Sequence, residues 1–192
     1  MARTFVTPGP DGLRALSHPG RLRMLGLLRS EGPATATTLA NRLGLNTGAT
    51  SYHLRQLQKH GFVVEDEERG NGRDRWWRAA HTTTRTDLAA TSPEEHDTYD
   101  AYLGAVALLN HERLLRSLEE RQLLPDPWRA IGDLSDWTLR LTPQRAEALA
   151  DAVHAMIDEY AEDDEDDPDA VPFVLNFNAF VRPGSIDAGE SR

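Results

Sequence analysis

Residues 36–61, ATTLANRLGLNTGATSYHLRQLQKHG, decide the fold of the N-terminal part of this chain. The first half of the stretch carries apolar residues at helical spacing, at Leu39, Ala40 and Leu43. Thr35 or Thr37 precedes them as a helix N-cap. Gly44 ends this helix, because glycine adopts a positive φ at little cost. A second helix follows after a three-residue turn, so the stretch predicts a helix-turn-helix.

The second helix begins at Asn46 or Thr47 and extends to about His60. At 100° per residue, one side of the helix carries Ala49, Thr50, His53, Leu54 and Leu57. The other side carries Gly48, Ser51, Tyr52, Arg55 and Lys59. The second side bears cations and hydroxyls, as a helix in the major groove of DNA needs. Its N–H groups at the N-terminus favour a phosphate. The candidate DNA-binding residues here are Asn46, Thr47, Gly48, Ser51, Tyr52, Arg55 and Lys59. The alternative is that this side is an ordinary solvent-exposed helix face. The three-residue turn between the two helices argues against that alternative.

A β-hairpin is predicted directly after this helix. Phe62–Val64 and Arg75–Arg78 form its strands, and Gly70-Asn71-Gly72 forms its turn. The tip carries Arg69, Arg73 and Arg75, which could lie over the flanking minor groove, where the negative potential is enhanced. The alternative is that the acidic run Glu65–Glu68 holds these arginines in salt bridges.

Another helical stretch precedes the helix-turn-helix, in residues 11–30. Its leucines recur at helical spacing, and Pro19 interrupts it. Ser17 or His18 then caps a second helix, with Pro19 in its first turn.

Five pieces of the N-terminal part resemble a known family. They are ALSHPGRLRML at 15–25, LA at 39–40 with LG at 43–44, TSYHLRQL at 50–57, GFV at 61–63, and RWWR at 75–78. In this order and spacing they resemble the ArsR-type winged-helix transcriptional regulators over about residues 11–81. The resemblance implies a dimeric DNA-binding protein, usually a repressor. It also implies a recognition helix at 47–60, with Thr47, Gly48, Ser51, Tyr52 and Arg55 contacting DNA, and a wing at 64–78.

The chain departs from that family in two ways. The founding members sense metals through cysteine pairs or Asp/His sites on the terminal helix, whereas this chain has no cysteine. His96 and Asp100 are spaced i, i+4, but a solvated pair on an acidic helix explains them more simply. We therefore expect neither a metal site nor a cofactor. The C-terminal part is longer than a single dimerisation helix, and more resembles the extended regulators common in actinobacteria.

The charge is divided unevenly along the chain. Residues 1–80 carry twelve Lys and Arg against seven Asp and Glu, and residues 81–192 carry nine against twenty-four. Only the first part, with a net charge of +5, suits a nucleic acid partner.

The absence of cysteine excludes disulfides and thiolate chemistry. No apolar run reaches the length of a membrane span, and no signal peptide opens the chain, so we expect no membrane partner and a cytoplasmic protein.

The C-terminal part is predicted to be helix–strand–helix–strand, which makes the fold class α+β. A Thr-rich linker at 82–93 leads to a long helix at 94–122, and a strand follows at 137–141. A helix from Pro143 to about Tyr160 is capped by Thr142, and residues 173–182 alternate as a strand. We thus expect three parts: a winged helix-turn-helix domain at 1–81, the linker at 82–93, and a region at 94–192 for dimerisation and possible effector sensing. The apolar positions of the long helix exceed a single stripe, so part of it is expected to pack on its own winged helix and part on a second copy.

The sequence outside the helix-turn-helix contains no recognisable catalytic motif. No phosphate loop, zinc-protease motif or nucleophile elbow is present, so we expect no catalytic residues and no enzyme. The histidines His18, His53, His60, His81 and His154 are expected to be structural, with satisfied hydrogen bonds. Aromatic side chains could line a pocket for a small-molecule effector, or merely fill the core: Tyr99, Tyr102, Trp128, Trp137, Phe173 and Phe177.

The sequence predicts a homodimeric regulator that binds double-stranded DNA, and the family resemblance implies a repressor. The sequence also allows two alternatives. One is a protein-interaction adaptor whose winged helix does not bind DNA. The other is a small-molecule-binding protein or enzyme that acts through the C-terminal region.

Overall fold

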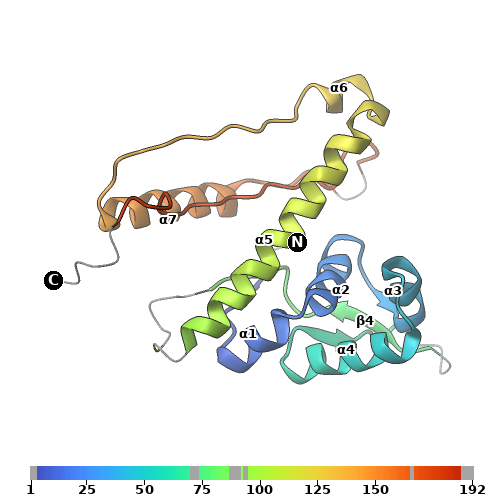
Figure 1. Cartoon of the computed structure of the whole chain (residues 1–192). Coiled ribbons are helices and arrows are strands. Elements are labelled where there is room, and N and C mark those ends of the chain that lie inside the picture. The colour runs from blue at the N-terminus through green and yellow to red at the C-terminus, as the bar shows by residue number, and fades with distance from the viewer. Residues whose placement is uncertain (1–3, 70–73, 87–91, 93–94, 165–166, 187–192) are drawn as a thin grey trace. The chain divides into compact units, whose positions relative to one another are not determined.

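The computed structural model describes residues 4–69, 74–86, 92, 95–164 and 167–186 (Figure 1). The chain divides into two compact units, Met1–Ile131 and Gly132–Arg192. Among the described residues, no helix combines the length and the apolar character that crossing a membrane requires.

Four helices form the first half of unit 1: α1 (Pro10–Leu16), α2 (Pro19–Ser30), α3 (Ala36–Leu43) and α4 (Thr47–Lys59). Their ends follow the local sequence. The His18 ring accepts a hydrogen bond from the Gly20 N–H and caps α2, and the Thr35 hydroxyl accepts one from the Thr38 N–H and caps α3. Gly44 ends α3 at a φ of 64°. The predicted helix-turn-helix is therefore confirmed, caps included.

A three-stranded antiparallel sheet in the order β2-β4-β3 follows the helices. It contains β2 (Ala34–Thr35), β3 (Val63–Glu65) and β4 (Trp76–Ala79). Val63 lies opposite Ala79 and Glu65 opposite Trp77, which confirms the hairpin, with each strand shifted by one residue from its predicted position. The short strands β1 (Phe5–Val6) and β5 (Thr83–Thr84) pair in parallel, and neither they nor β2 is predicted by the sequence. The α+β class and the winged form of the helix-turn-helix are thus observed directly.

The core of unit 1 lies between the helices and β4. Its buried side chains come from every helix of the winged part and from the hairpin: Leu13, Leu16, Met24, Leu25, Leu28, Leu39, Leu54, Leu57, Phe62, Val63 and Trp77. Of the two adjacent tryptophans, Trp77 is buried and Trp76 is half-buried. Alternation along a strand places their side chains on opposite faces of β4.

The long helix α5 (His96–Glu120) belongs to unit 1, although the sequence places it in the C-terminal region. It contacts α1 and α2 and buries Tyr99 and Tyr102 in the core, as expected for the part that packs on its own winged helix. An ion pair of 2.6 Å joins Arg23 on α2 to Glu112 on α5. Because this packing ties α5 to the winged part, the units divide after Ile131 rather than at 82–93. Of the expected linker, residues 87–91 and 93 lie outside the described residues.

After α5, unit 1 ends in two short elements that the sequence does not predict, the 3-10 helix η3 (Arg121–Leu123) and α6 (Asp126–Arg129). Unit 2 contains the helix α7 (Pro143–Glu159). The Thr142 hydroxyl accepts a hydrogen bond from the Arg145 N–H at 3.4 Å, which confirms the predicted cap. Figure 1 shows the described chain after α7 running back beside that helix.

The two strands predicted in unit 2 are absent from the described structure, and both predictions are wrong for the single chain. Residues 137–141 and 173–182 form no helix and no ladder. Alternation of apolar side chains reports how a strand buries its faces, but a strand also needs a neighbouring backbone to pair with. Within the described part of one chain, these segments have no such neighbour.

Candidate nucleic-acid interface

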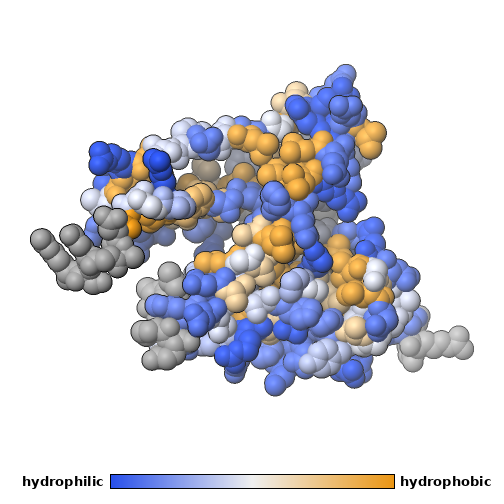
Figure 2. Space-filling view, viewed as in Figure 1, coloured by the Kyte–Doolittle hydropathy of each residue, from blue (hydrophilic) through white to orange (hydrophobic). Residues whose placement is uncertain are grey.

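Helix α4 has one buried side and one exposed side. Thr50, Leu54 and Leu57 are completely buried, so they fix the helix against the core. Tyr52, Arg55 and Lys59 are exposed on the other side, and Ser51 is half-buried. The structure therefore brings the predicted side chains together along one edge. The surface over α4 is largely hydrophilic (Figure 2).

The N-terminus of α4 combines a cap with an exposed first turn. Asn46 is the N-cap, and its Oδ1 accepts a hydrogen bond of 2.8 Å from the Ala49 N–H. Thr47 and Gly48 are exposed. The N–H groups of a first helical turn lack partners within the helix and point outwards. Thr47 and Gly48 are thus placed to present backbone donors to a phosphate, whereas the side-chain carbonyl of Asn46 is engaged in capping.

Two histidines, His18 and His53, contact each other next to the exposed edge of α4. The rings of His18 and His53 lie 4.5 Å apart, and the His53 ring meets the Tyr52 ring edge-on at 5.6 Å. Burial and the nearby Arg21 guanidinium lower the pKa of His18, and burial, His18 and Arg21 lower the pKa of His53. Within the described part of the chain, the buried Nδ1 of His53 has no hydrogen-bond partner. The expectation that His53 is satisfied is therefore wrong at this atom. The contact joins two helices, so no local sequence signal reveals it.

This pair predicts that stability falls on acidification. Because both pKa values are below 6.5 in the folded protein, the unfolded chain binds more protons as the pH falls through 6.5. The free energy of unfolding therefore decreases in that window, and it levels off below the lowered pKa values. Urea unfolding monitored between about pH 5 and 8 measures the slope.

The matched test uses His18→Asn with His53→Gln. Asparagine retains a cap acceptor for the Gly20 N–H, so the double variant removes the titrating rings and keeps the helix start. We expect its stability to depend less on pH in that window, while His111→Gln, which replaces an exposed histidine on α5, behaves as the wild type does. An unchanged slope in the double variant contradicts this assignment.

The arginines near the wing tip are held by carboxylates. Arg75 lies 3.2 Å from Glu65, and Arg69 lies 3.8 Å from Asp66. Arg75 also sits over the Trp77 ring at 5.8 Å. For these two residues the structure has the salt bridges that the sequence left open as an alternative, and Arg73 lies outside the described residues. Exposed pairs contribute about 0–1 kcal/mol, so a phosphate can compete for either arginine.

The six aromatic residues of the predicted effector pocket fall into both units. Tyr99 and Tyr102 are part of the unit 1 core, and the Tyr99 hydroxyl donates to the Thr86 hydroxyl at 3.1 Å. Trp128 is half-buried on α6. In unit 2, Trp137, Phe173 and Phe177 are exposed.

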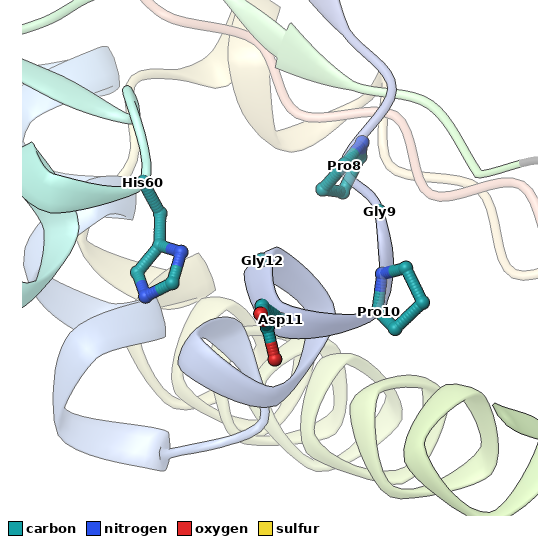
Figure 3. A pocket seen from close by; sticks show the side chains of 6 residues that line it. All are labelled: Pro8, Gly9, Pro10, Asp11, Gly12 and His60. Carbon is teal, nitrogen blue, oxygen red and sulfur yellow. The ribbon is translucent and has the colours of Figure 1, made fainter.

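A shallow pocket of about 420 Å³ lies elsewhere, at the start of α1. Its lining is Pro8, Gly9, Pro10, Asp11, Gly12 and His60 (Figure 3). None of the six aromatic residues contributes to it. Among the described residues there is also no group of three or more His, Asp or Glu side chains arranged to hold a metal ion.

Comparison with known proteins places a recognised domain over this interface. Residues 16–66 match the model of a helix-turn-helix domain family. The chain is 44% identical over 54 residues to the HTH-type transcriptional regulator NmtR of Mycobacterium tuberculosis, which covers 28% of this chain and 44% of that protein. The chain thus matches less than half the length of this curated relative.

A solved structure of a mutant of ZitR from Lactococcus lactis, in the apo form, aligns with 74% of this chain and 83% of its own. The sequence identity is 16% and the TM-score is 0.33, which is too low to establish a common fold over that length. The segment with a family match begins at the end of α1 and ends after β3. This chain therefore carries a helix-turn-helix domain in residues 16–66, and the exposed edge of α4 lies within it.

Proposed function

We propose that this protein is a DNA-binding transcriptional regulator that contacts duplex DNA through α4, with the wing at 64–78 beside it. The observation that carries the proposal is the exposed edge of α4, where Tyr52, Arg55 and Lys59 project from a helix whose opposite side is locked in the core. A helix in the major groove needs such an edge, with polar tips for base edges and cations for phosphates. The partial match to a transcriptional regulator supports the same function.

The charge distribution agrees with this proposal. The first 80 residues have a surplus of five positive charges, and all the proposed contacts lie among them: Asn46, Thr47, Gly48, Ser51, Tyr52, Arg55, Lys59, Arg69, Arg73 and Arg75. Attraction to the phosphate backbone supplies most of the non-specific affinity of DNA-binding proteins.

We further propose an ArsR-type homodimer that represses transcription. In a dimer, two copies of α4 spaced by one helical turn, about 34 Å, occupy successive major grooves and block the polymerase. An effector acts on such a dimer by changing the spacing of the two copies of α4, which takes a difference in affinity of about 1–3 kcal/mol between the two states.

A second candidate function is a protein-interaction adaptor, and one observation favours it. Arg69 and Arg75 are already paired with carboxylates, and the residues after 80 carry a surplus of fifteen negative charges. Such a chain is repelled by DNA if the acidic part lies near the groove. An adaptor is expected to show no salt-dependent binding to any DNA duplex, and this difference separates it from a regulator.

Selection of bound fragments from random and genomic DNA, repeated at two salt concentrations, tests the proposal. A regulator enriches one sequence motif, and raising the salt weakens its binding to all sequences. Recovery of no DNA at the lower salt concentration contradicts the proposed function and favours the adaptor.

Lys59 provides a prediction that concerns phosphates rather than bases. Lys59 lies at the last turn of α4 and is exposed. We expect Lys59→Ala to weaken binding to selected and unrelated duplexes by the same factor, and to flatten the plot of log affinity against log salt by about 0.9. Titration at several salt concentrations measures the slope, and Lys59→Arg, which keeps the charge, is the control. A loss limited to the selected sequence contradicts a phosphate contact.

A further inference from the structure

Unit 2 exposes apolar side chains that a stable protein normally covers. Within its described part, residues 132–164 and 167–186, no residue is buried. Its exposed large apolar residues are Leu134, Trp137, Leu139, Leu141, Leu149, Met156, Tyr160, Val171, Phe173, Val174, Leu175, Phe177, Phe180, Val181 and Ile186. Exposed apolar area on this scale marks an interaction site, because monomeric soluble proteins rarely leave it in contact with water.

Segment 173–182 has the sequence pattern of a strand but pairs with no described backbone. Pro172 and Pro183 flank the segment. Proline lacks the N–H that a ladder needs inside a strand, so it is usual at strand ends. Apolar side chains alternate along it, and Phe177 contacts the His154 ring of α7 edge-on at 5.9 Å. The segment lies beside α7 in Figure 1, so that helix covers part of one face. Its backbone forms no ladder with any described residue.

We propose that segment 173–182 pairs antiparallel with the same segment of a second copy of this chain. The proposal deepens the homodimer of the proposed function and rests on it. A two-fold axis brings identical surfaces together, and two identical strands related by such an axis within one sheet run antiparallel. The second copy thus supplies the backbone neighbour that the segment lacks.

The apolar area is of the size that such a contact needs. Phe173, Phe177 and Phe180 are 64%, 43% and 78% exposed. With 150–250 Å² for an aromatic side chain, these three expose about 280–460 Å². On the same segment, Val174 and Leu175 are each 61% exposed. A standard interface takes about 800 Å² from each partner, so this segment alone supplies a large share.

The charges favour a second copy in this orientation. Segment 173–182 contains no acidic residue, although unit 2 is strongly acidic, and its one charged residue is Arg182 at the C-terminal end. Antiparallel pairing about the middle of the segment places Arg182 near position 173 of the other copy. The acidic run from Glu162 to Asp169 lies just before that position. A parallel arrangement brings the two Arg182 side chains together instead, which is unfavourable.

Cysteine crosslinking in the full chain tests the pairing, because the protein has no cysteine of its own. One cysteine at a time is placed at each position from 173 to 182, and mild oxidation is followed by non-reducing gel electrophoresis. In an antiparallel pair, directly opposite Cα atoms lie about 4.5–5.5 Å apart, within the range of a disulfide. We expect a shift from monomer to linked dimer at one position near the middle, with little linking at its immediate neighbours.

Ser135→Cys, an exposed position in the same unit, is the matched control and is expected to remain monomeric on the gel. Light scattering on the unmodified chain gives the oligomeric state independently. A monomer in solution overturns the proposal, and so does a dimer in which no position from 173 to 182 links. A monomer contradicts the proposed homodimer as well, whereas a dimer without linking contradicts the strand pairing alone. DNA binding is measured separately by the duplex selection, so failure of the strand pairing and failure of the proposed function are distinguishable. Linking at a central position, together with a dimeric mass, supports the proposal.

Discussion

Replacing Arg55 with alanine is expected to weaken binding to the selected duplex about 5- to 150-fold, which corresponds to about 1–3 kcal/mol for one bidentate contact to a base edge. Arg55 is exposed in the middle of α4, and among the described residues no carboxylate lies within ion-pair distance of its guanidinium. No carboxylate of the described residues therefore engages its donors before DNA arrives. Guanine O6 and N7 are the acceptors that an arginine in the major groove matches best.

The matched control for this variant is Arg116→Ala. Arg116 is exposed on α5 and pairs with Glu120 at 2.7 Å, so its removal changes the net charge equally but leaves α4 intact. Competitive binding to the selected duplex and to a scrambled one separates the two effects. We expect Arg55→Ala to lose mainly the preference for the selected sequence, and Arg116→Ala to retain it. If Arg55→Ala binds the selected duplex as tightly as the wild type, α4 is not the recognition helix.

The parts of this site that the sequence predicts correctly depend on neighbouring residues. The start of α4 at Thr47, the end of α3 at Gly44 and the two sides of α4 follow from local spacing and from the preferences of single residue types. The buried side of α4 is predictable because Leu54 and Leu57 lie three residues apart. The same locality explains the hairpin, because its two strands are close neighbours in the sequence, whereas the predicted turn at 70–72 lies outside the described residues.

The parts that the sequence does not predict depend on distant residues. The parallel pairing of β1 with β5 joins residues at opposite ends of the winged part, and the contact of His18 with His53 joins two helices. The width of the apolar surface on α5 indicates that it packs on the winged part, but not that α1 and α2 receive it. The strand predictions for 137–141 and 173–182 are wrong for a related reason. A period-2 pattern carries no information about which backbone will pair with the segment.

The largest effect on stability is expected from Leu54→Ala. Leu54 is completely buried at the centre of α4 and is part of the unit 1 core. Truncation removes transfer free energy and leaves a cavity, and together these cost about 2–5 kcal/mol. Because a typical domain has only about 5–15 kcal/mol of stability, the loss is a large fraction of the total. We expect the melting temperature to fall by roughly 5–20 °C, measured by circular dichroism.

Leu123→Ala is the matched control, since Leu123 in η3 is 84% exposed and the chemical change is identical. It is expected to alter stability by no more than about 0.5 kcal/mol. Below its melting transition, Leu54→Ala keeps Tyr52, Arg55 and Lys59 on the helix surface, so its binding to the selected duplex should stay close to that of the wild type. Arg55→Ala should show the opposite pattern, with a normal melting temperature and weak binding. If the two variants instead lose stability and binding in parallel, α4 does not divide into a structural side and a DNA-contacting side.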